Sequence, residues 1–162
     1  MATEVVSTIR SSGGDYTTLS AWEAGEQGDL VTADEIRTAE CYDDWPSGLS
    51  NTIVIDGSTT DSTRYMRITV AAGHRHNGIP QSGFHIVGST GAAGRVIYNG
   101  DNYTRIEWLD VENTGTGAYA FASASGLNIL FDRCIGTAQV GNGRGWIAIA
   151  STQVLRQCLA WG

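Results

Sequence analysis

The sequence contains no lysine, and it has only two prolines and three cysteines among its 162 residues. Its ten basic residues are all arginine, and with 17 acidic residues the net charge is −7. Such a chain favours neither nucleic acid nor an anionic membrane as a partner, because both need concentrated positive charge. No apolar run approaches the roughly 20 residues of a membrane-spanning helix. The N-terminus also lacks the basic and apolar regions of a secretory signal, so we expect folding in the host cytoplasm.

The three cysteines, Cys41, Cys134 and Cys158, are an odd number, which argues against a disulfide framework. No C-x-x-C motif or Cys/His cluster has the spacing of a zinc site. We therefore expect buried, reduced thiols that pack as small hydrophobes, and neither a metal nor a cofactor.

The 21 glycines divide most of the chain into short segments that are typical of strands. A length of 162 residues fits one domain. The pattern predicts an all-β protein. The expected strands are residues Thr52–Asp56, Met66–Val70, Phe84–Val87, Arg95–Tyr98, Ile106–Val111, Leu127–Phe131, Trp146–Ala150 and Gln153–Leu159.

One helix is expected near the N-terminus, over about residues 18–27. Leu19 and Trp22 fall on one face of it, and both are expected to be structural. Ser20 or a preceding threonine serves as the N-cap, with Glu23 at capping-box spacing, and Gly28 ends the helix.

The second half of the chain repeats with a period of about 24 residues. Apolar or cysteine side chains recur in three sets at this spacing: Ile106, Leu130 and Val154; Val111, Ile135 and Leu159; and Cys134 and Cys158. Regular leucines and an Asn ladder are missing, which excludes a leucine-rich repeat, and propeller blades are longer. A right-handed parallel β-helix, a solenoid in which each rung stacks on the previous one, fits best.

Such stacking makes Cys134 and Cys158 interior neighbours. Their spacing permits a disulfide, and a cytoplasmic location favours two reduced thiols. Trp108, Asp132 and Arg156 are expected to form an outward-facing column, with an Asp–Arg pair worth at most about 1 kcal/mol.

The stretch from Gly13 to Ala24, the segment from Ala39 to Trp45, and the rung motifs of residues 130–135 and 154–159 resemble right-handed β-helix proteins of the pectate-lyase-like superfamily. Proteins of this kind occur among bacteriophage structural proteins. The resemblance implies that residues 1–50 form an N-terminal cap whose helix closes the solenoid. Residues 51–162 are then the rungs, with an uncapped C-terminal end.

Several polar groups were considered as catalytic or metal sites. The acidic candidates are Asp43 with Asp44, Glu107 with Asp110 and Glu112, and Asp132 with Arg133. Glu107 and Asp110 are expected on opposite faces of one strand, and Asp43 and Asp44 in a turn. His74 and His76 are expected in an exposed turn. We therefore expect no catalytic residue and no metal ligand.

An uncapped solenoid end exposes strand edges and apolar surface, so either the chain continues or a partner covers that end. We expect a non-enzymatic component of a bacteriophage virion, above all a capsid decoration (cement) protein, and less so a tail spike or fibre segment. The expected partners are the major capsid protein or other virion proteins and further copies of the chain, with a trimer plausible. Interface candidates are Trp45, Trp146 and Trp161. The alternative is a carbohydrate-active β-helix, either a polysaccharide lyase or hydrolase fragment or a glycan-binding module.

Overall fold

The structure is a computed structural model that describes residues 1–91, 94–124, 128–138, 144–148 and 152–161. The strands of this part of the chain form three sheets, and all the pairings within them are parallel. The helices are short: α1 (Leu19–Glu26), α2 (Leu30–Ala33) and the 3-10 turn η1 (Ala72–His74). The all-β expectation is confirmed.

The strands are distributed evenly over the sheets. The first sheet has the order β1 (Thr3–Ile9), β2 (Glu35–Cys41), β5 (Met66–Val70), β8 (Arg105–Glu107), β11 (Asn128–Asp132) and β14 (Thr152–Arg156). The second has the order β3 (Leu49–Ser50), β6 (His85–Gly88), β9 (Asp110–Asn113), β12 (Ile135–Ala138) and β15 (Leu159–Trp161). The third has the order β4 (Ile53–Ile55), β7 (Arg95–Asn99), β10 (Tyr119–Ser123) and β13 (Arg144–Ala148).

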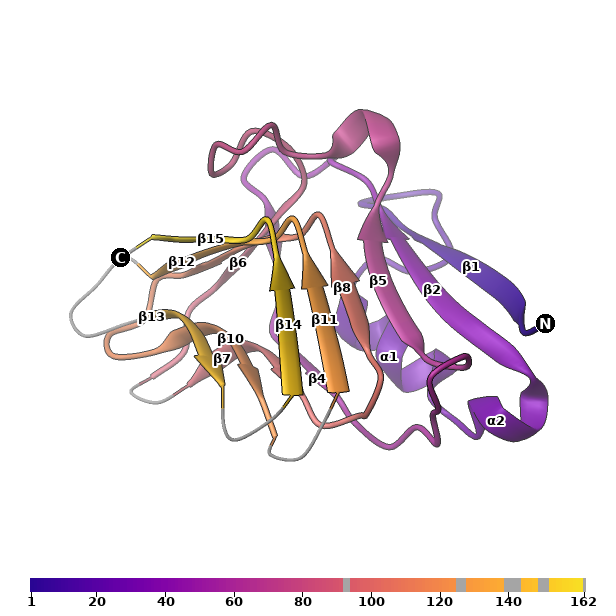
Figure 1. Ribbon diagram of the computed structural model, residues 1–162. Helices are drawn as coiled ribbons and strands as arrows, with labels where there is room; N and C mark the ends of the chain where they lie inside the picture. Colours follow the sequence, from indigo (N-terminus) through magenta and orange to yellow (C-terminus); the bar gives the residue numbers. More distant parts are fainter. Residues whose placement is uncertain (92–93, 125–127, 139–143, 149–151, 162) are drawn as a thin grey trace.

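From β2 onward the chain visits the first, second and third sheets in turn and then begins again. Figure 1 shows the strands of the first sheet side by side, from β1 near the N-terminus to β14, with β15 at the far end near the C-terminus. Stacked parallel sheets of this kind are consistent with a parallel β-helix.

The register between turns is less regular than the expected period. β11 and β14 pair at 24 residues, so Leu130 faces Val154 as expected. β8 and β11 pair at 25 residues, so Ile106 faces Phe131 and not Leu130. The same extra residue places Val111 opposite Gly136 and not Ile135. A slip of one residue exchanges the two faces of a strand, which decides where Leu130 points.

The corners between the first and second sheets explain this. Trp108, Arg133 and Gln157 all have left-handed backbone conformations, with φ of 61°, 53° and 52°. Left-handed φ is uncommon outside glycine. The three corners stack, since the Arg133 guanidinium lies 4.8 Å from the Trp108 ring centroid and its Nε donates to Gln157 Oε1 at 2.8 Å. Each expected strand that crosses such a corner therefore divides into two strands.

The core lies between the three sheets. On the first sheet, Ala39, Ile68, Ile106 and Phe131 follow one another in register and are buried. Phe131 meets Phe121 of the third sheet edge to face, with ring centroids 5.4 Å apart. The sheets are therefore joined by direct side-chain packing.

Helix α1 lies close to its expected position. Thr18 is the N-cap and accepts a hydrogen bond from Ala21 N at 3.2 Å. Leu19 and Trp22 are fully buried, as their helical spacing predicts. The capping-box role of Glu23 was wrong, because this buried carboxylate accepts from Asp56 N at 3.2 Å instead.

Residue 50 does not separate a cap from the rungs in the pairing pattern. β1, β2 and β3 precede it, and β2 and β3 pair with β5 and β6 that follow it. Residues 71–84, which we call the strap, lengthen the connection between β5 and β6 and include η1. His76 of the strap is buried, and its Nε2 lies 2.8 Å from Arg133 O. The expectation of an exposed turn was therefore wrong for His76.

Candidate functional site

The outward face of the first sheet is ion-paired over its earlier strands. Arg67 of β5 lies between two carboxylates, with Glu4 Oε1 at 3.0 Å and Glu107 Oε2 at 2.6 Å. The hydrogen bond from Thr38 and the charge of Arg67 lower the pKa of Glu4, although burial opposes them. These contacts satisfy the charged groups on β1, β5 and β8 within the protein.

The same face becomes apolar at β11 and β14. Arg67, Arg105, Leu130 and Val154 occupy successive positions of one ladder. Leu130 is partly exposed and Val154 is 48% exposed. The pairing of Leu130 with Arg105 shows that it lies on the outward face, while its neighbour Phe131 is buried.

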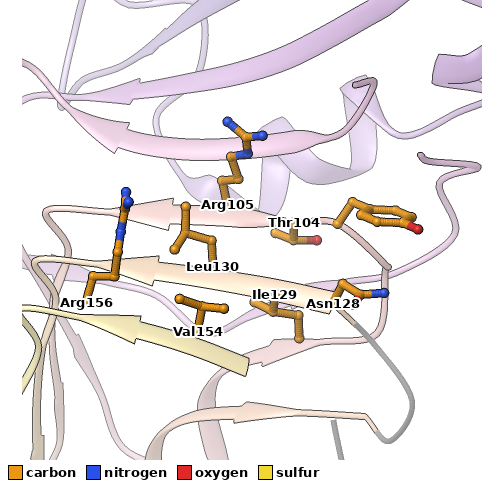
Figure 2. A pocket seen from close by; sticks show the side chains of 8 residues that line it. Thr104, Arg105, Asn128, Ile129, Leu130, Val154 and Arg156 are labelled. Carbon is orange, nitrogen blue, oxygen red and sulfur yellow. The ribbon is translucent and has the colours of Figure 1, made fainter. Parts of the chain in front are cut away.

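These residues line a shallow cavity of about 260 Å³, which we call the groove. Figure 2 shows Arg105, Leu130 and Val154 on the neighbouring strands β8, β11 and β14, with Arg156 farther along β14. The groove is lined by Tyr103, Thr104, Arg105, Asn128, Ile129, Leu130, Val154 and Arg156.

Two arginines flank the apolar floor of the groove. The Arg105 guanidinium lies 4.0 Å from the Tyr65 ring centroid, and none of the ion pairs among the described residues involves it. Arg156 is 3.2 Å from Asp132 Oδ2, and 60% of its side chain is exposed. The expected Asp132–Arg156 pair is thus present, whereas Glu107 and not Trp108 continues its ladder. An apolar floor between cations suits a partner with an apolar side chain beside a carboxylate.

More apolar surface adjoins the groove. Leu155, Leu159 and Trp161 of β14 and β15 are between 41% and 53% exposed. Exposed apolar side chains that gather in one place, unlike scattered ones, indicate an interaction surface.

The expected interface tryptophans do not form one surface. Trp161 is exposed next to this region. Trp45 is partly buried and packs edge to face on Phe84, with ring centroids 5.8 Å apart. Trp146 belongs to β13, and its side chain lies outside the described residues.

The expected structural residues divide into two groups. Ile106, Val111, Cys134 and Ile135 are buried, together with Leu19 and Trp22. Cys158 and Leu130 are intermediate, and Val154 and Leu159 are exposed. The exposed residues of the second group belong to the groove or to the surface beside it.

The acidic candidates fall at different places. Glu107 lies on the first sheet and Asp110 on the second, because the chain turns at Trp108. Asp44 pairs with Arg10, Nε to Oδ2, at 3.1 Å. Asp43 lines a separate cavity of about 370 Å³ with Trp45, Gln81 and His85.

Asp110 and Glu112 are the one acidic pair from the candidates that shares a strand face, two residues apart on β9. Gln81 of the strap covers both, since its backbone N donates to Asp110 Oδ2 at 2.5 Å and its Nε2 to Glu112 Oε2 at 2.6 Å. Burial raises the pKa of Asp110, while the Gln81 hydrogen bond and the nearby His85 and His76 oppose that rise. As it stands, this pair is occupied by the strap.

Two further surveys concern the described residues only. They contain no group of three or more His, Cys, Asp or Glu side chains placed to hold a metal ion. None of their helices has the length and apolar character needed to cross a bilayer.

Comparison of the chain with protein-family models, with curated proteins and with solved structures finds no match.

The signal for the groove was present in the sequence and was interpreted in the opposite sense. Leu130 and Val154 were recognised as a stacked pair and assigned to the interior. The alternation of β11 contradicts this, because Ile129 and Phe131 on either side of Leu130 are both buried.

Proposed function

We propose that this chain is a non-enzymatic assembly protein that binds further copies of itself through the groove of the first sheet. The observation that carries the proposal is the change along one outward ladder, from the ion-paired Arg67 to the exposed Val154. A face meant only for solvent would be expected to stay polar along its length.

A second copy fits the groove in charge. The chain carries 17 acidic and ten basic residues, so another copy offers many carboxylates to Arg105 and Arg156. Burial of Leu130 and Val154 would supply the apolar contribution, at about 25 cal/mol per Å² of area removed from water. A rigid strand face also limits the entropy lost on binding.

We further propose a right-handed parallel β-helix whose N-terminal end is closed by α1. Connections between parallel strands of one sheet are right-handed in about 98% of cases. The burial of Leu19 and Trp22 and the packing of α1 on β4 support the capping role. An experimental structure would measure the hand directly, and a left-handed path would contradict this proposal.

The biological setting that we propose is a bacteriophage virion, with the chain as a capsid decoration protein and a tail spike or fibre segment as the second placement. The resemblance of residues 13–24 and of the rung motifs to β-helix proteins supports this setting. Mass analysis of purified particles should find the chain in fixed stoichiometry. Its absence from particles in cells that express it would contradict the virion proposal.

Self-association is tested by sedimentation equilibrium of the wild type, Val154→Asp and Val54→Asp. Val54 is the matched control, since it is 57% exposed on β4, outside the groove. We expect the wild type to associate and Val154→Asp to weaken association about tenfold or more, equivalent to about 1.4 kcal/mol. Val54→Asp should leave association unchanged. A wild type that stays monomeric, or equal effects of the two variants, would refute the proposal.

The alternative, a carbohydrate-active β-helix, has one specific observation in its favour. The cavity that contains Trp45 and His85 lies beside the strap residue Gln81, which covers Asp110 and Glu112. Incubation with polygalacturonate or alginate, with and without calcium, tests it. A product with the absorption of an unsaturated uronate would overturn the non-enzymatic proposal.

A further inference from the structure

Cys134 and Cys158 stand directly above one another at the corner between the first and second sheets. They precede β12 and β15, which pair in register from Ile135 and Leu159 onward. The backbone N of Leu159 donates to Cys134 O at 2.9 Å. Paired strands are about 4.8 Å apart, and a disulfide accepts Cα separations of about 4.4–6.8 Å. The backbone spacing therefore permits a bond between these two residues.

The two thiols also point to the same side. Cys134 Sγ donates to Ile106 O at 3.4 Å, and Cys158 Sγ donates to Phe131 O at 3.5 Å. Ile106 and Phe131 are themselves neighbours in the ladder of the first sheet. Each sulfur thus reaches the equivalent carbonyl of the preceding turn, which leaves the two sulfurs adjacent.

The two sulfurs differ in exposure and acidity. Cys134 is fully buried, and burial raises the pKa of its thiol well above the ordinary value. Cys158 is only partly buried, and a hydrogen bond with Cys134 lowers its pKa to about 7. Because the thiolate is the reactive form, Cys158 is the thiol that reacts first near neutral pH.

We propose that Cys134 and Cys158 form a redox-sensitive modification site, in which a small-molecule disulfide such as oxidised glutathione converts the thiol pair into a disulfide that staples two successive turns. This inference is independent of the docking function, because it concerns the inner side of the corner and not the groove.

The reaction occurs in two exchanges. The Cys158 thiolate attacks one sulfur of oxidised glutathione, which breaks that S–S bond and releases one glutathione thiolate. Cys134 then gives its proton to solvent, and its sulfur attacks Cys158 Sγ and displaces the second glutathione thiolate. Both released thiolates take up protons according to pH. Two protein thiols are oxidised, and one glutathione disulfide is reduced to two glutathione thiols.

Cys41 provides the internal control. It is buried in β2, where its ladder neighbours are Ile9 and Val70, so no cysteine stands beside it. Cleavage after arginine places the three cysteines in three different peptides, residues 38–64, 134–144 and 157–162. Each pairing therefore has its own mass.

The experiment treats the folded chain with oxidised glutathione, blocks the remaining thiols, digests with trypsin and identifies linked peptides without reduction. We expect one intramolecular link between peptides 134–144 and 157–162, with Cys41 recovered as a free thiol. The link should persist in Cys41→Ser and disappear in Cys158→Ser. The rate should rise with pH and reach half of its maximum near pH 7, the pKa of Cys158.

Two results would overturn the proposal. One is a wild type that keeps all three thiols free, or that retains glutathione on Cys158 without closing the bond. The other is a link that joins two chains or includes Cys41. Because the wild type alone gives the decisive peptide map, the test does not depend on whether a serine variant folds.

Discussion

Adjacent residues of β11 provide the sharpest test of the fold, because they lie on opposite faces of the strand. The pair of substitutions is Leu130→Ala and Phe131→Ala. Phe131 is 1% exposed, lies in the ladder between Ile106 and Leu155, and meets the Phe121 ring at 5.4 Å. Leu130 is partly exposed in the groove.

The expected costs differ several-fold. Removing a buried phenylalanine side chain costs about 3–5 kcal/mol through lost transfer energy and the cavity left behind. The edge-to-face contact with Phe121 contributes about 0.5–1.5 kcal/mol of this. Leu130→Ala loses roughly 40 Å² of apolar burial and leaves no sealed cavity, so it should cost about 1 kcal/mol. For a chain of this size, Phe131→Ala should lower the melting temperature by roughly 6–15 °C.

Urea unfolding followed by far-ultraviolet circular dichroism measures both free energies, with Val54→Ala as an exposed control on β4. The slopes with urea must agree, so that changes in midpoint report stability. If Leu130→Ala costs as much as Phe131→Ala, or more, then β11 has slipped by one residue relative to β8. The 24-residue alignment of Ile106 with Leu130 would then be correct, and the groove would not exist.

Two further predictions concern a close backbone contact and a buried charge. Gly115→Ala should cost about 3 kcal/mol in the same urea titration, because a Cβ there would lie 1.6 Å from Thr90 O. Gly28→Ala, where a Cβ meets nothing within 4 Å, should change stability by less than about 0.5 kcal/mol, and equal costs would contradict this. Asp110→Asn should gain stability relative to the wild type as the pH rises above about 4. Burial raises the pKa of Asp110 from the ordinary 3.8, so its contribution is fully present below that value and is lost as the pH rises through the raised pKa. Unfolding free energies measured at several pH values check this, and a difference that does not vary with pH would argue against it.

Local sequence signals predicted those elements whose ends coincide with turns. Met66–Val70 was predicted to the residue, and the helix expected over about 18–27 is α1 at Leu19–Glu26. Turn residues next to an apolar run, and apolar spacing on one helix face, are short-range features that one sequence contains. The strands at Thr3–Ile9 and Glu35–Cys41 were missed, because charged and polar residues interrupt their alternation.

Features that depend on the next turn of the chain were not predictable in the same way. The left-handed corners occur at Trp108, Arg133 and Gln157, residue types that give no glycine signal. The contacts between neighbouring corners hold this conformation. Because each corner residue sets the register of the following strand, one unrecognised corner was enough to place Leu130 in the core.

One turn of the chain can carry both an outward docking face and an inward thiol pair, since strand alternation separates them. Val154 continues the outward ladder of Arg105 and Leu130, and Cys158 lies beyond the end of β14, with its sulfur against Phe131 O in the interior. A bond from Cys158 to Cys134 would fix β14 against β11 without using any side chain that lines the groove. The groove exists only while these two strands stay paired, because Leu130 comes from one and Val154 from the other. The staple and the docking face are therefore chemically independent, and they are mechanically connected through the pairing of β11 with β14.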